Sequence, residues 1–257
     1  MVKIFRKIRQ NLLSENRVGK YLLYAIGEII LVVLGILIAV QINSESTFRK
    51  NKIIEYEILV DLKIEFEANL QELEKSIKIS NDIAYNSKKL LMACWDDYKP
   101  ISEDSLRSLI GSSFMYSEQE FKYDNSVQLE LINTGKQSLI NSKEIRKFIS
   151  SCNKQLELVN YQEKVVDQYR QRSIDIYLNL GNNAVLMNKD FVSSMESKQI
   201  RTNLSLLESL PFENTLGIYE GTSRHLAEVK YNDMKEKISD VIALIDTSLN
   251  NYHFYKH

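Results

Sequence analysis

The feature that most constrains this chain is a long apolar stretch near its beginning, from Tyr21 to Ile42. It contains one charged residue, Glu28, and nothing polar occurs from Ile29 to Val40. Because a helix rises about 1.5 Å per residue, about 20 residues cross a hydrocarbon core roughly 30 Å thick. A buried helix of a water-soluble domain normally keeps a polar stripe, and these turns have none. The stretch therefore predicts a membrane span.

Basic residues precede this span in excess over acids, which include only Glu15. They are Lys3, Arg6, Lys7, Arg9, Arg17 and Lys20. This bias predicts a cytoplasmic N-terminus, although Arg49, Lys50 and Lys52 after the span weaken it. A cleaved signal peptide is the alternative, but the basic region is long and the exit, IAVQIN, lacks a small-x-small site. We expect an uncleaved anchor in the inner membrane, with the C-terminal domain periplasmic.

The chain then divides into a cytoplasmic basic segment (1–20), a transmembrane helix (21–43) and an extracytoplasmic domain (44–257). Within residues 3–13, apolar side chains recur at spacings of three and four between basic ones. This pattern is typical of a helix lying at the lipid headgroups, and a frayed basic tail is the alternative.

The composition of the remainder favours an all-α fold. Only 8 Gly and 2 Pro occur in 257 residues, so few positions break a helix. No Gly or Pro occurs between Gly35 and Pro100, and the apolar spacing predicts a long helix continuing from the span. We expect this helix to join a helical bundle.

Later segments supply the rest of the predicted bundle. The apolar spacing predicts long helices from Ser142 to about Leu180 and from Tyr219 to Leu249, and a shorter helix stopped by Pro211. The aromatic and polar segment from Ser112 to Asn125 has no helical stripe, so we expect an exposed loop or a small strand pair.

Residues 3–43 carry an FRKIR start, a KY-x-x-YAIGEI entry and a VLGILIA-x-QIN exit. They resemble the N-terminus of a family of single-span bacterial membrane proteins known as a domain of unknown function. A looser similarity covers Leu129 to Phe148, and SESTFRK stands where that family commonly has a tryptophan-bearing N-W-N run. The resemblance implies a helical extracytoplasmic domain, but no activity and no catalytic residues.

Glu28, Gly35 and Ala39 fall on one face of the predicted span. Gly35 and Ala39 form a small-xxx-small pair that lets another helix approach closely, which predicts a homo-oligomer or a partner membrane protein. Glu28 can bind such a partner or relay a proton, as in stator subunits of proton-driven motors. Alternatively, it lies near the cytoplasmic end, where Lys20 or a headgroup reaches it.

The two cysteines, Cys94 and Cys152, form no CxxC pair that would indicate a metal or redox site. A periplasmic location permits a disulfide between them. Two buried free thiols are the favoured alternative, because Cys152 follows a core pattern that needs no partner. Trp95 is expected to close one end of the core, with ligand stacking as the alternative.

The sequence shows no known catalytic or cofactor-binding motif. His225, His253 and His257 lack metal-ligand spacing, and no phosphate-binding or nucleophile motif occurs. Asp96, Asp97 and the nearby Asp104 lack calcium-loop spacing and are expected to be surface acids. A net charge of -1 gives no field for nucleic acid. We therefore predict no metal, no cofactor and no nucleic-acid partner.

Two functional classes remain. The first is a membrane-anchored helical module that binds a partner or ligand in a scaffold-like or sensor-like role. The second is a membrane-bound enzyme whose site assembles from distant residues, which would show convergent polar groups with shifted pKa values. A stator-like subunit using Glu28 is a third hypothesis.

Overall fold

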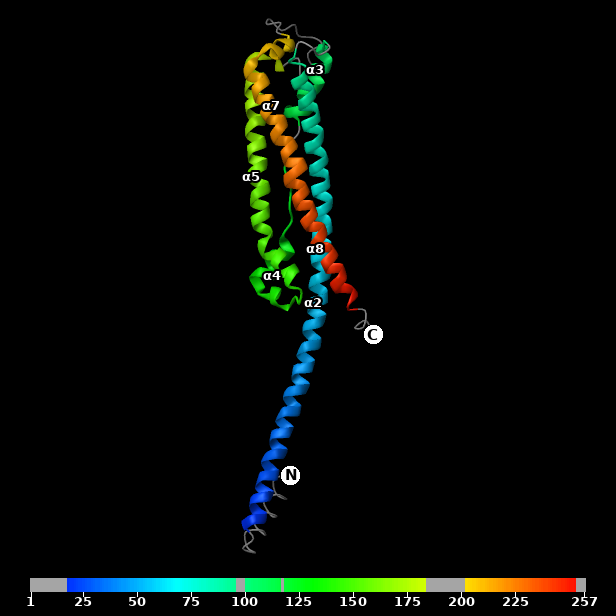
Figure 1. Ribbon diagram of the computed structural model, residues 1–257, viewed down its shortest axis with the longest axis vertical. Coiled ribbons are helices and arrows are strands. Elements are labelled where there is room, and N and C mark those ends of the chain that lie inside the picture. The colour runs from blue at the N-terminus through cyan, green and yellow to red at the C-terminus, as the bar shows by residue number, and fades with distance from the viewer. Residues whose placement is uncertain (1–17, 96–99, 117, 184–201, 253–257) are drawn as a thin grey trace. The chain divides into compact units, whose positions relative to one another are not determined.

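The computed structural model describes residues 18–95, 100–116, 118–183 and 202–252 (Figure 1). In these ranges every regular element is helical and none is a strand, which confirms the all-α class. The elements are α2 (Val18–Met92), α3 (Glu103–Ile110), η1 (Gly111–Met115), α4 (Ser126–Thr134), η2 (Lys136–Leu139), α5 (Lys143–Leu180), η3 (Asn203–Glu208), α7 (Leu210–His225), η4 (Leu226–Tyr231) and α8 (Asn232–Asn250). The predictions for residues 3–13, Asp96, Asp97, His253 and His257 lie outside the described residues.

The chain forms two compact units, Met1–Tyr56 and Glu57–His257. The first unit holds the described start of α2, whose large apolar side chains between Leu22 and Ile42 are about half exposed or more. Among the described residues, α2 is the one helix long and apolar enough to cross a membrane. The structure therefore supports a single candidate span near the N-terminus.

The second unit is a bundle built on the later part of α2. The segment α7–η4–α8 runs antiparallel to α2, since Lys63 pairs with Asp246 at 2.6 Å and Glu74 pairs with Lys235 at 2.8 Å. As the residue number rises along α2, it falls along the partner. These ion pairs lie at the surface and fix the register more than they stabilise the fold.

Helix α5 runs parallel to α2 and antiparallel to α7. The rings of Phe66 and Phe148 meet edge to face with centroids 5.3 Å apart. Between α5 and the segment α7–η4–α8, Gln162 Nε2 donates to the Thr222 carbonyl at 3.3 Å and Lys237 Nζ donates to Gln155 at 2.6 Å. The residue number therefore rises along one as it falls along the other. Large apolar side chains from all these helices fill the core, among them Leu62, Phe66, Tyr177, Phe212 and Ile238.

The segment from Ser112 to Asn125 was predicted to be an exposed loop or a small strand pair, and the structure corrects this in two ways: residues up to Met115 belong to η1, and the non-helical remainder is not an exposed loop. Residues 118–125, here called the strap, are extended and run down the bundle between η1 and α4 (Figure 1). Gln119 and Phe121 are buried, whereas Glu118, Glu120 and Lys122 are exposed. This alternation is that of an extended chain with one face inward. The segment is therefore an internal arm and not an exposed loop.

An extended arm among helices lacks the hydrogen bonds of a helix or sheet, so its backbone needs other partners. Asn69 provides two, because its Nδ2 donates to the Asp124 carbonyl at 2.6 Å and its Oδ1 accepts from the Asp124 N–H at 2.8 Å. Ser76 Oγ donates to the Glu120 carbonyl at 3.3 Å. Glu163 Oε1 accepts from the Phe121 N–H at 2.8 Å. Buried polar residues on α2 and α5 thus complete the strap.

The ends of the helices show which capping and stop signals in the sequence were read correctly. Ser142 caps α5 by accepting from the Ile145 N–H at 3.3 Å, and α5 ends at Leu180 as expected. The short helix predicted before Pro211 is present only as the 3-10 helix η3, which ends at Glu208. Pro211 is not its stop signal, because Pro211 lies in the first turn of α7, where its missing N–H costs nothing. The predicted last long helix is present, but η4 interrupts it with a π-helical turn.

Candidate functional site

A polar hollow opens between the strap and α5 in the second unit. Its volume is about 710 Å³, within the roughly 300–1,000 Å³ of small-molecule sites. Apart from Val166, its lining residues are all polar or charged. The charged ones are four acids and two bases: Glu118, Glu120, Glu163, Asp167, Lys164 and Arg170. The strap supplies the first two acids, and α5 supplies the rest.

Glu163 joins three elements at one side of the hollow. Its Oε1 accepts from the Phe121 N–H of the strap at 2.8 Å and from the Tyr231 hydroxyl of η4 at 2.7 Å. Its Oε2 has no hydrogen-bond partner among the described residues and is not fully buried, although the residue as a whole is only 9% exposed. Burial raises the pKa of Glu163, and nearby Glu120 adds to this effect, while the two hydrogen bonds lower it. Burial thus opposes the ionised form of this carboxyl, whereas hydrogen-bond donors or a nearby cation favour it.

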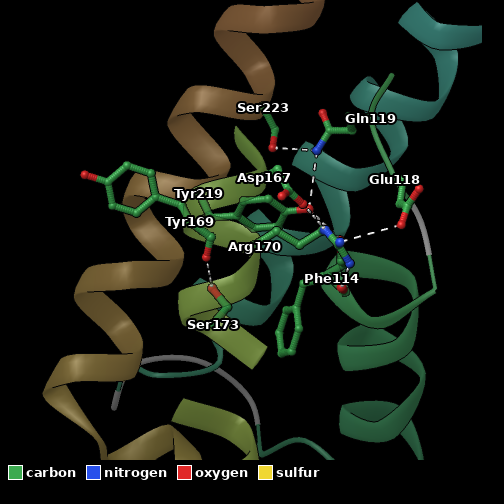
Figure 2. A network of polar contacts seen from close by, with 10 residues as sticks. Phe114, Glu118, Gln119, Asp167, Tyr169, Arg170, Ser173, Tyr219 and Ser223 are labelled. Atoms are coloured by element: carbon green, nitrogen blue, oxygen red, sulfur yellow. Dashed lines mark hydrogen bonds and ion pairs between the residues drawn. The ribbon is translucent and has the colours of Figure 1, made fainter. Parts of the chain in front are cut away.

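Arg170 is the less exposed of the two basic residues of the hollow, and its charge is already balanced. Its guanidinium lies 2.9 Å from Asp167 and 3.7 Å from Glu118, and donates to the Phe114 carbonyl at 3.4 Å (Figure 2). Asp167 precedes it by three residues on α5, a spacing that places both side chains on one face. Arg170 therefore ties α5 to η1 and to the strap.

Gln119 turns inward from the strap toward α7. Its Nε2 donates to Ser223 Oγ at 2.9 Å and to the Tyr219 hydroxyl at 3.3 Å, and Tyr219 in turn donates to the Ser113 carbonyl at 3.0 Å. The Gln119 carbonyl oxygen is buried without a partner among the described residues, and Figure 2 shows it turned away from Tyr219. Burial raises the pKa of Tyr219 to about 12, so this hydroxyl stays protonated and remains a donor.

Two π-helical turns place the partners of this network. In η1, the Ser113 carbonyl accepts from the Tyr219 hydroxyl and the Phe114 carbonyl accepts from Arg170. In η4, the extra residue per turn carries Tyr231 inward to Glu163. Such turns are rare and often lie at functional sites.

A second buried network lies at the other end of the strap. Glu65 accepts from the Val127 N–H at 2.6 Å and from Gln128 Nε2 at 2.9 Å, so it caps the start of α4 from another helix. Cys152 Sγ lies 3.1 Å from the Tyr123 hydroxyl. Burial raises the pKa of both Tyr123 and Cys152. We interpret these groups as structural, since they provide hydrogen-bond partners for polar groups of the strap and of the start of α4.

The two cysteines are free thiols, so the disulfide alternative is not realised. Cys152 lies one turn beyond Phe148, which packs on Phe66 of α2. Cys94 follows the far end of α2, roughly 35 Å higher along the bundle at about 1.5 Å per residue. A disulfide needs Cα atoms within about 7 Å. Because α2 and α5 run parallel, the end of α2 and the first third of α5 lie far apart.

The sequence suggested that Trp95 closes one end of the core, and the structure shows that it does not. It is 52% exposed, and its Nε1 donates to Glu213 at 2.9 Å in the first turn of α7. Glu28, Gly35 and Ala39 lie on α2 in the first unit, away from the residues of the hollow in sequence and in unit. A side chain built at Gly35 meets nothing within 4 Å in this single chain, which leaves its face available.

No pattern in the sequence pointed to the hollow. Glu118, Glu120 and Glu163 look like ordinary solvated acids when they are read in sequence. The signal that was present is the short alternation of polar and apolar residues from Glu120 to Tyr123, which is typical of an extended segment. Searches of family models, of curated proteins and of solved structures find no match to this chain.

Proposed function

We propose that this chain is a single-span protein of the inner membrane whose helical unit lies on the periplasmic side and binds a ligand or partner. The observation that carries the proposal is the exposed apolar surface of α2 between Leu22 and Ile42. Apolar surface left in water costs about 25 cal/mol per Å², so a stretch of this length favours lipid. The basic residues before it favour a cytoplasmic N-terminus.

The polar hollow supports the binding role. It is built from a strap and a helix that need several buried polar groups to stay together, and it leaves Glu163 Oε2 unpartnered among the described residues. We also propose, from the similarity over residues 3–43, that the chain belongs to the single-span family of unknown function. That similarity agrees with an anchored helical domain and names no reaction.

Reporter fusions test the topology. A phosphatase reporter active at the C-terminus and inactive at Asn11 is the expected result, because the enzyme folds only outside the cytoplasm. An inactive C-terminal fusion, with a fluorescent cytoplasmic reporter active there instead, would overturn the orientation. Co-purification from native membranes followed by mass spectrometry then identifies what the helical unit holds.

An enzyme is the second candidate, and Glu163 is the observation that favours it. A buried carboxyl with a raised pKa in a hollow has the properties of a general acid. The two candidates differ in what becomes of the ligand: an enzyme converts it, whereas a binding module releases it unchanged. Mass spectrometry of the ligand before and after incubation separates them. The stator hypothesis depends on Glu28 and stays a sequence prediction.

A further inference from the structure

We propose that the hollow between the strap and α5 binds a small organic ammonium ion, held by the carboxylates of Glu163 and Glu120. This inference rests on the proposed function, because it names the ligand of the same hollow. It is carried by the unpartnered oxygen of a nearly buried carboxylate, the balance of charge around it, and the size of the space.

The oxygen available to a ligand is Oε2 of Glu163. Both hydrogen bonds of Glu163 end on Oε1, and Oε2 keeps its acceptor capacity toward the hollow that the residue lines. A carboxylate oxygen held in place by two donors on its neighbour is already oriented. A ligand that donates to it therefore orders no further side chain.

The second step is the charge balance. Arg170 is paired with Asp167 and Glu118, so these three groups add no net positive charge. Glu120 and Glu163 line the same hollow, and the negative charge of Glu120 contributes to the raised pKa of Glu163. Lys164, the other base of the wall, forms no ion pair within the described ranges. A cation bound between the two carboxylates relieves their repulsion.

The third step selects the kind of cation. Ca²⁺ and Mg²⁺ take six or more oxygen ligands, and no group of three or more His, Cys, Asp or Glu in the described chain could hold a metal. A protonated amine instead carries three donors on one nitrogen. Two carboxylates and the amide oxygen of Asn160, which also lines the wall, offer acceptors for them. The volume of about 710 Å³ leaves room for the carbon chain that follows.

Calorimetry on the full chain in neutral detergent tests the inference, with diaminobutane as the probe. We expect saturable binding in the micromolar to millimolar range, and no binding of butanediol, which has the same length without charge. Glu120→Gln should weaken the binding about tenfold, because hydrogen bonds to charged groups are among the strong ones. This side chain is exposed, so the variant should fold normally.

Glu163→Gln should weaken the binding of diaminobutane at least as much. Glu157→Gln is the matched control, since Glu157 is an exposed acid on α5 outside the hollow. Equal affinity for the diol, or unchanged affinity in both hollow variants, would overturn the inference. So would magnesium or calcium binding in place of the amine.

A wider panel separates this failure from failure of the proposed function. If a sugar or a dicarboxylate binds and Glu120→Gln changes its affinity, the hollow is a binding site and only the ammonium assignment is wrong. If no compound binds and the hollow variants leave every co-purified partner in place, both proposals are wrong.

Discussion

At the scale of single residues, several buried polar side chains of this bundle form hydrogen bonds to the backbone of the strap, which has no helical hydrogen bonds of its own. Asn69 shows this most clearly, because one amide bonds both the N–H and the carbonyl of Asp124. An amide replaced by a short apolar side chain leaves both groups without that partner. Asn69 is nearly buried, whereas Asp124 is exposed and water can replace part of the loss.

Asn69→Ala should therefore lower the free energy of unfolding by about 1–3 kcal/mol, the cost of unsatisfied polar groups. Each kcal/mol corresponds to about 2–4 °C in a domain of this size, so thermal melting followed by circular dichroism detects it. Gln71→Ala is the control, since Gln71 is exposed on the same helix. Equal melting temperatures for the two variants would show that the Asn69 bonds contribute little.

Glu163 gives the stability of the fold a pH dependence. Its folded pKa is raised above the usual value of about 4.3, so below that pH both states are protonated and its contribution is full. As the pH rises through the folded pKa, the folded state must bury a charge and the contribution is lost. Glu163→Gln keeps an acceptor for Phe121 and Tyr231 but removes this titration.

The melting temperature of Glu163→Gln relative to wild type should therefore increase as the pH rises from about 4 and then level off. Melting curves at several pH values between 4 and 8 measure it, with Glu157→Gln as the control that should track wild type. A difference that shrinks as the pH rises would mean that the ionised form is the better partner for the strap.

At the scale of elements, two glycines show how the backbone conformation at a position decides the effect of a substitution on stability. Gly135 ends α4 in the left-handed region at φ 70°, whereas Gly221 lies inside α7; a side chain built at either position meets nothing within 4 Å. Gly135→Ala should destabilise the fold by about 1 kcal/mol, because an L residue is strained at this φ. Gly221→Ala should stabilise it by about the same amount, because Ala favours a helix interior.

Urea unfolding of the two glycine variants, compared with wild type, measures both shifts. Opposite signs are expected because the two sites differ in backbone conformation and not in available space. If both variants were destabilised, the interior of α7 would require glycine for a reason other than its helical conformation.

The sequence predicted elements well wherever local signals act alone. Ser142 and Leu180 bound α5 as expected, since capping and apolar spacing are local properties. Pro211 was misread because proline is a stop signal within a helix and a start signal in its first turn. The strap was missed because its burial depends on Asn69, Ser76 and Glu163, which lie far away in sequence.

The candidate site was unpredictable from sequence for the same reason. Glu163 becomes unusual only when η4 brings Tyr231 to it and the strap brings Phe121. No spacing rule connects these residues, because they join through tertiary packing. The apolar span, by contrast, is a property of one uninterrupted stretch and was visible at once.

At the scale of the whole molecule, the remaining question is what contacts the apolar segment of α2. Gly35 and Ala39 are a small-xxx-small pair on the face that carries Glu28. Inside a membrane, helices associate by close packing and hydrogen bonding, since lipid is as apolar as leucine. An acid on the same face gains from a polar partner across the contact.

Gly35→Leu should therefore weaken self-association or partner capture, because the larger side chain holds a second helix away. Val33→Leu is the matched control: it adds bulk on the opposite face of the same helix, about 200° away at 100° per residue. Chemical crosslinking in native membranes, resolved on denaturing gels, measures the dimeric or partner-bound fraction for each variant. A clear loss for Gly35→Leu beside an unchanged Val33→Leu supports the contact. An equal loss for both would mean that the contact does not use this face, and no loss for either would mean that the small pair has no role in assembly.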